Sequence, residues 1–159
     1  MHGLGRGAAQ AGTTVMARRL VTLGAVLVML GLLTGFVSGS LANPRMGLSA
    51  HLEGLMNGTL LIALGAAWGH VRLPAGAERW CWWLLAYGTL ANWLAVLLGA
   101  VWGAGRTTMP LVGAQASVQA AAWQEQLVTA LLVSLSVAMV AAFALVLRGL
   151  LAPRGQAQG

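Results

Sequence analysis

The sequence is short of charge. Among its 159 residues there is no Asp and no Lys, and the acids are Glu53, Glu78 and Glu125. Charged residues make up 8% of the chain and hydrophobic residues 58%, whereas a soluble domain usually carries about 25% charged residues. With a mean hydropathy of +0.79, the composition argues against a soluble domain and indicates a membrane protein.

Several kinds of site are also missing. Cys81 is the single cysteine, so no intrachain disulfide can form. No Cys pair and no two-His spacing on one helix suits zinc, and nothing matches a nucleophile triad, a P-loop or a dinucleotide fingerprint. The nine basic residues are all Arg and give a net charge of +6. They flank apolar segments instead of lining one face, which indicates a membrane protein and not a nucleic-acid-binding one.

Four apolar runs are near the roughly 20 residues that span a bilayer. They predict an all-α fold, a polytopic membrane four-helix bundle in one domain over residues 18–151, with helices at about 20–37, 50–71, 80–102 and 127–147. The first run could instead be a signal peptide, with Ser40-x-Ala42 as a cleavage site. Its length and its small-xxx-small spacing at Gly31, Gly35 and Gly39 favour a retained helix that another helix can approach closely.

The connections carry the remaining predictions. Residues 1–17 and 152–159 are expected to be flexible tails. Asn43-Pro44 is expected to break the chain between the first two helices, with Ser49 capping the second, and residues 114–124 to form a short surface helix. Seven arginines fall on the side of the termini and two, Arg45 and Arg106, on the other. By the positive-inside rule both termini are cytoplasmic, in a bacterial inner membrane.

Polar residues concentrate in residues 43–58, at the mouth of the second helix. Ionisable groups there are costly in lipid and mark a functional-site hypothesis. At about 100° per residue, Glu53 and Asn57 share one face of the helix, and Gly54 and Gly58 the adjacent one. We expect a flat cofactor to lie on the glycine surface, with His51 on its metal.

Each of these side chains also has a structural interpretation. His51 is either a metal ligand or a hydrogen-bonded group near the interface. Glu53 either transfers a proton or complements the helix dipole. The amides of Asn57 and Asn92 either orient a substrate or pair between helices, and Tyr87 either donates a proton or anchors its helix.

The run Asn-Pro-Arg-Met-Gly-Leu-Ser at 43–49, His-Leu-Glu-Gly at 51–54 and Asn57-Gly58 resembles the signature of the hydroxylaminobenzene mutases. Tyr87-Gly88-Thr89, Ala91-Asn92-Trp93 and residues 102–105 resemble the same pattern, and the likeness extends over roughly residues 18–150. These mutases are membrane isomerases that convert hydroxylaminobenzene to 2-aminophenol. The His51-x5-Asn57-Gly58 spacing is also similar to styrene oxide isomerase, a related four-helix enzyme.

The resemblance implies an isomerase that acts on aryl hydroxylamines, with haem b iron as Lewis acid in a homotrimer. His51 would be the axial ligand, and His51, Gly54, Gly58 and Arg45 would bind the cofactor. Asn57 and Asn92 match residues of the family pattern, and we predict that they act in catalysis together with Glu53 and Tyr87, although Tyr87 is not at the position of the family's tyrosine.

One departure concerns the epoxide chemistry. Gly88 and Val96 fall where styrene oxide isomerase has an aspartate and a tyrosine, which favours the mutase activity. An epoxide isomerase, a non-catalytic haem-binding or electron-transfer subunit and a structural membrane protein without a cofactor remain as alternatives.

Overall fold

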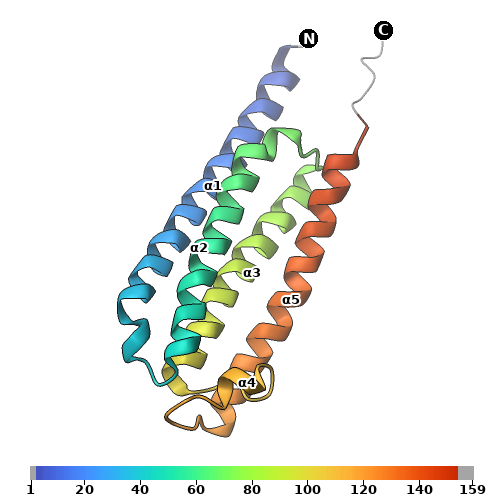
Figure 1. The fold of residues 1–159 in the computed structure, drawn as a ribbon. Helices are drawn as coiled ribbons and strands as arrows, with labels where there is room; N and C mark the ends of the chain where they lie inside the picture. The colour runs from blue at the N-terminus through green and yellow to red at the C-terminus, as the bar shows by residue number, and fades with distance from the viewer. Residues whose placement is uncertain (1–2, 154–159) are drawn as a thin grey trace.

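The computed structural model describes residues 3–153, with side chains from Thr14 onward. Four long helices run along one another in an up-and-down arrangement, and α1 begins at the same end of the bundle at which α5 ends (Figure 1). No strand occurs in this part of the chain, as an all-α fold requires. The elements are α1 (Gly3–Val37), η1 (Ser38–Ser40), α2 (Pro44–Ala67), η2 (Trp68–His70), α3 (Ala75–Trp102), α4 (Pro110–Gly113) and α5 (Ala122–Leu151).

Three of these helices are long and apolar enough to cross a membrane, over Thr14–Ser40, Ala75–Trp102 and Ala122–Leu151. The 24-residue α2 is not among them. Its length would suffice, since 24 residues rise about 36 Å, but it carries the polar residues of the 43–58 stretch. A spanning role for α2, and hence the count of four spans, stays a prediction.

The helix ends differ from the predicted ones in three places. α1 is helical from Gly3, so the tail expected over residues 1–17 is wrong from residue 3 onward, and residues 1–2 lie outside the described chain. Met16 precedes the apolar run and is buried in the core. Its packing favours a helix at this position. A short helix in the 103–126 connection is α4, at Pro110–Gly113, and not at 114–124. Of the tail expected over 152–159, residues from 154 on lie outside the described chain.

The turn after α3 depends on glycine. Gly103 ends the helix with φ +68°, a left-handed conformation that glycine adopts without steric cost. The amide of Ala104 then donates to the Gly99 carbonyl, 3.1 Å away. The chain is thereby directed across the end of the bundle towards α4.

Glycines set the contact between α1 and α2. A Cβ at Gly54 would lie 2.5 Å from the Cα of Gly31, and a Cβ at Gly58 would lie 2.6 Å from the Gly24 carbonyl oxygen. Only glycine permits this backbone approach, which is how helices associate where lipid removes the hydrophobic driving force. The predicted close approach at Gly31 is confirmed, whereas Gly39 has no neighbour within 4 Å.

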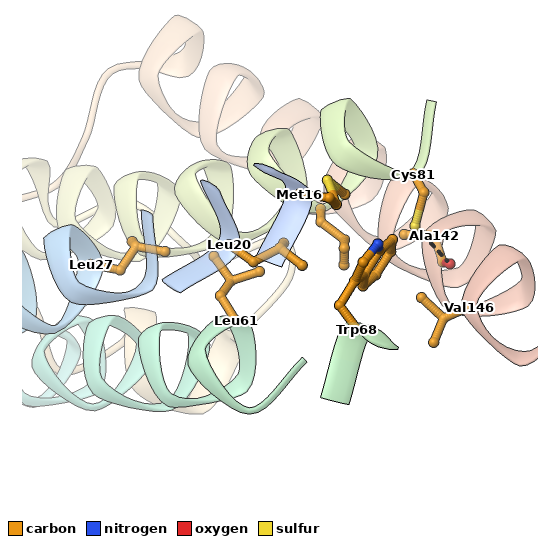
Figure 2. Close-up of a cluster of buried hydrophobic side chains, with 9 residues drawn as sticks. Met16, Leu20, Leu27, Leu61, Trp68, Cys81, Ala142 and Val146 are labelled. Atoms are coloured by element: carbon orange, nitrogen blue, oxygen red, sulfur yellow. Dashed lines mark hydrogen bonds between the residues drawn. The ribbon is translucent and has the colours of Figure 1, made fainter. Parts of the chain in front are cut away.

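Two apolar clusters fill the bundle. The larger joins all four long helices around Trp68, which is 2% exposed, and the Cys81 thiol donates to the Ala142 carbonyl at 3.8 Å (Figure 2). The smaller contains Met46, Ala50, Val96 and Ala100, near the α4 end of the bundle. These clusters fix α2 between α1 and α3, and so determine which way its polar residues face.

Candidate functional site

The start of α2 is fixed by Asn43. Its side-chain Oδ1 accepts from the Met46 amide at 3.1 Å, while its Nδ2 donates to the Val112 carbonyl at 2.7 Å. Its own amide donates to the Ala100 carbonyl. Asn43 is therefore the N-cap of α2 and ties α2 to the end of α3 and to α4. The predicted cap at Ser49 is wrong: Pro44 suits the first helical position and pushes Asn43 into the extended geometry of a cap.

Glu53 lies between α2 and α3. Its Oε2 accepts from Asn92 Nδ2 at 2.6 Å and from Asn57 Nδ2 at 3.3 Å. Asn57 is buried, and Glu53 and Asn92 are half-buried. Among the described residues Oε1 has no hydrogen-bond partner. The three residues thus form a carboxylate held by two amides, with one oxygen left for another donor.

His51 faces the other way, towards α1. Its Nδ1 lies 2.8 Å from the Gly31 carbonyl oxygen, and its ring packs on Gly35, where a Cβ would lie 2.7 Å from Nδ1. A carbonyl can only accept, so this contact requires the proton on Nδ1, and in the neutral imidazole the lone pair is then on Nε2. Ligating histidines have this arrangement, in which the second nitrogen donates to a carbonyl or carboxylate.

The predicted cofactor surface is not present. Gly54 and Gly58 are buried, and the backbone of α1 occupies the space beside them. A flat cofactor cannot lie on these glycines without separating α1 from α2. The prediction that these glycines and polar residues lie on one helix is confirmed. Gly54 and Gly58, however, contact α1 and not a cofactor.

The remaining predicted residues are not brought to Glu53. The Tyr87 hydroxyl is paired with Ser134 Oγ of α5 at 2.6 Å, on an exposed part of α3. Arg45 is exposed in the first turn of α2. Successive helical positions differ by about 100°, so His51 and Glu53 point about 160° apart on α2. Within one chain, the structure therefore separates the expected metal ligand from the expected proton-transfer group.

Two hydrogen-bonded contacts in the structure were not predicted from the sequence. Trp93 Nε1 donates to Thr34 Oγ1 at 3.2 Å, which joins α3 to α1 near His51. The Glu125 carboxylate accepts from the Gly105 amide at 3.0 Å and from the Arg106 amide at 3.3 Å, and so holds the turn after α3. A lone acid at the start of an apolar span was the available signal for Glu125.

A metal held wholly by side chains has little support here. Within residues 3–153, no group of three or more His, Cys, Asp or Glu converges. The case for a metal therefore rests on the free Nε2 of His51 as a single ligand. That nitrogen could hold the iron of a haem, whereas Gly54 and Gly58 could not contact the group because α1 occupies the space beside them.

The comparisons with known proteins agree with the resemblance. The family described as styrene oxide isomerase matches residues 16–151. Hydroxylaminobenzene mutase HabB of Ectopseudomonas oleovorans is 49% identical over 135 residues, which cover 85% of this chain and 81% of the relative. Hydroxylaminobenzene mutase HabA of the same organism is 43% identical over 136 residues, covering 86% and 99%. No solved structure matches. The chain belongs to the styrene oxide isomerase family, and it is an isomerase.

Proposed function

We propose that this protein converts aryl hydroxylamines of the hydroxylaminobenzene type into 2-aminophenols. The two hydroxylaminobenzene mutases, which resemble it over about 85% of its length, support this substrate class. The structural observation that carries the proposal is the Glu53 carboxylate, which two amides hold through one oxygen. A half-buried acid with a fixed orientation and one open oxygen is suited to proton transfer.

The reaction needs such a group because it moves protons without net change. The N–O bond breaks, a C–O bond forms at the ortho carbon, that carbon loses a proton and the nitrogen gains one. Reactant and product are isomers, so no electron donor or acceptor is required. Glu53 Oε1 would take up and return the proton, while Asn57 and Asn92 keep the carboxylate in place.

The proposal includes haem b on His51, through Nε2. Bound haem would supply a Lewis acid, which stabilises the charge that develops as the N–O bond weakens. The Gly31 carbonyl would fix the ring and raise the basicity of the ligating nitrogen. Arg45, six residues before His51 and exposed, is the proposed partner for a haem carboxylate.

We further propose that the active unit is a homotrimer in which neighbouring chains complete each site. The support is the opposite orientation of His51 and Glu53 on α2. His51 packs on α1 and Glu53 pairs with Asn92 of α3, so a site that used both groups would need a contribution from a neighbouring chain. Tyr87, exposed on α3, would then act from the neighbouring chain or serve only to join α3 to α5.

The proposed location is a bacterial inner membrane, with both termini in the cytoplasm. Arg72, Arg79 and Arg148 lie in or beside the α2–α3 connection and the last turn of α5, and Arg19 of α1 lines the same hollow as Arg79. Arg45 and Arg106 lie beside the α1–α2 and α3–α4 connections, at the other end of the bundle (Figure 1). His51 would then be nearer the outer surface.

Two variants and their mixture test the proposal. Purified protein should show a Soret band and form 2-aminophenol from hydroxylaminobenzene, His51→Ala should lose both, and Glu53→Gln should keep the band and lose most of the turnover. Differently tagged His51→Ala and Glu53→Gln chains are then co-expressed and the mixed oligomers isolated. Regained turnover supports shared sites, and an inactive mixture contradicts them. Full activity of His51→Ala would exclude the haem mechanism.

The family name favours one second candidate, the isomerisation of an aryl epoxide to an aldehyde. Gly88 packs on Met139 and Val96 is 5% exposed in the smaller apolar cluster. Neither position supplies the acid or phenol expected for the epoxide reaction. Styrene oxide supplied to the same preparation should therefore give little phenylacetaldehyde, and efficient conversion would favour this candidate.

A further inference from the structure

Two adjoining hollows lie at the arginine-rich end of the bundle, and neither is lined by Glu53 or His51. The larger is a groove of about 590 Å³ between α1 and α3, lined by Arg18, Arg19, Leu23, Val26 and Trp82 among others. The smaller, about 190 Å³, is lined by Arg19, Glu78, Arg79 and Trp82 among others. Because Val15, Arg19 and Trp82 line both, the two hollows are neighbours.

The two hollows differ in character. Three arginines line the two hollows: Arg18 lines the larger, Arg79 lines the smaller, and Arg19 lines both. Within residues 14–153 none of their guanidinium groups forms an ion pair or a hydrogen bond. The single acid, Glu78, already accepts from Trp68 Nε1 at 3.1 Å through Oε1. This end therefore presents a surplus of unpaired positive charge.

The rest of the groove is apolar and runs into the predicted span. Val26 is seven residues beyond Arg19 on α1, a rise of about 10 Å. Leu23 and Val26 line it from α1, and the Trp82 ring lines it from α3. A ligand that fits must therefore have an anionic group joined to an apolar chain, with the anionic end at the start of the Thr14–Ser40 span.

We propose that this site binds one anionic phospholipid, with its phosphate on the three arginines and an acyl chain along Leu23 and Val26. Basic pockets between membrane helices bind acidic lipid headgroups in this way. An apolar helix of another protein is disfavoured, since it would bury three guanidinium groups without partners. Free phosphate would leave the apolar groove unfilled.

The groove between α3 and α5 provides an internal comparison. It holds about 670 Å³ and is lined by Trp80, Leu84 and Leu145, with Arg148 as its one charged residue. It lies at the same end of the bundle and has the same apolar character, but it lacks the cluster of arginines. We expect it to accept lipid chains without a preference for headgroup charge.

The test is the thermal stability of the full-length protein in detergent during titration with dioleoyl phosphatidylglycerol or dioleoyl phosphatidylcholine. The anionic lipid should raise Tm at much lower concentration. One arginine near a lipid surface changes affinity about fivefold, so R18Q/R19Q/R79Q should weaken phosphatidylglycerol binding on the order of 100-fold. The matched control R148Q should bind as wild type. If the triple variant does not fold, R19Q alone should weaken binding about fivefold.

Three results would overturn the proposal. Equal half-saturating concentrations for the two lipids would show that charge is not recognised. An unchanged response in the arginine variants, or an equal loss in R148Q, would place binding elsewhere. The same rise of Tm with glycerol phosphate alone would show that the apolar groove takes no part. Bound phosphatidylglycerol detected by native mass spectrometry in wild type and lost in the variant would support the proposal independently.

Discussion

The most specific prediction concerns Gly35→Ala, one turn from the Gly31 carbonyl that holds His51. A Cβ at this position would lie 2.7 Å from His51 Nδ1 and 3.1 Å from Cε1. The obstacle is a side chain and not backbone, so the imidazole can move while the helices stay in contact. The substitution should therefore disturb His51, the proposed haem ligand, and spare the fold.

The size of the disturbance follows from the distances. Ordinary contact begins at 3.4 Å, and the predicted Cβ lies 2.7 Å from the ring, so the imidazole must retreat by about 0.7 Å. A bond of 2.8 Å to the Gly31 carbonyl does not survive such a shift, because hydrogen bonds extend only to about 3.2 Å. Loss of a partner behind a ligand usually weakens metal affinity or activity by about 10–100-fold. Helix propensity opposes any unfolding, since Ala is favoured over Gly by about 1 kcal/mol.

The assay is a haem titration followed by the Soret band, with turnover of hydroxylaminobenzene measured on the same samples. Gly39→Ala is the matched control, because Gly39 has nothing within 4 Å of its potential Cβ. Nitrogen NMR of labelled histidine in haem-free protein gives a second measurement. His51 of wild type should be protonated at Nδ1, and Gly35→Ala should show a mixture of tautomers.

Wild-type haem affinity and an unchanged Nδ1 proton in Gly35→Ala would show that Gly35 does not control the position of the His51 ring. An equal impairment of Gly39→Ala would also contradict the reasoning, because the effect would then reflect any methyl group at this end of α1. A variant that loses haem but keeps its tautomer would locate the fault in haem access and not in the ring.

Three further substitutions test the packing around the site by melting in detergent. Gly54→Ala meets backbone 2.5 Å away and should cost about 1–3 kcal/mol of unfolding free energy; an equal effect of Gly76→Ala, which meets nothing within 4 Å, would contradict the backbone-contact explanation. Asn43→Ala removes a helix cap and a buried partner and should cost roughly 2–3 kcal/mol, whereas an unchanged Tm would show that the cap is dispensable. Glu125→Ala frees the Gly105 and Arg106 amides, which should then exchange hydrogen faster than in wild type; unaltered exchange would show that other contacts hold the turn.

Much of the fold could be predicted because apolar length and flanking arginines are properties of local sequence. The residues at which the helices begin were harder to predict, because the ends of the helices are less apolar than their middles. The sequence predicts a break at Asn43-Pro44, and the structure has Pro44 as the first residue of α2, because proline restricts the residue before it and also fits the first helical turn. The extension of α1 back to Gly3 could not be inferred from hydropathy, since its first residues are small and not periodic.

The residues of the candidate site could be predicted, but the neighbouring element that each of them faces could not. The spacing of Glu53 and Asn57 placed them on one face, and the structure confirms that contact and adds Asn92 from α3. Spacing alone could not say that Gly54 faces another helix and not a ligand, because a smooth glycine surface suits either. Which element covers a face of a helix depends on the tertiary structure. Here α1 covers the face that carries Gly54, so this glycine contacts a helix and not a ligand.

The same helix carries the polar groups and the tightest packing, and the two features depend on each other. In a membrane, helices do not gain stability by hiding apolar surface from one another, so a polar helix needs close backbone contact or paired polar groups to stay in place. α2 has both, because its glycines contact α1 while Glu53 pairs with Asn92 of α3. The α1 side of α2 is therefore held by the backbone contact at Gly54 and Gly58, and its α3 side by the polar contact of Glu53.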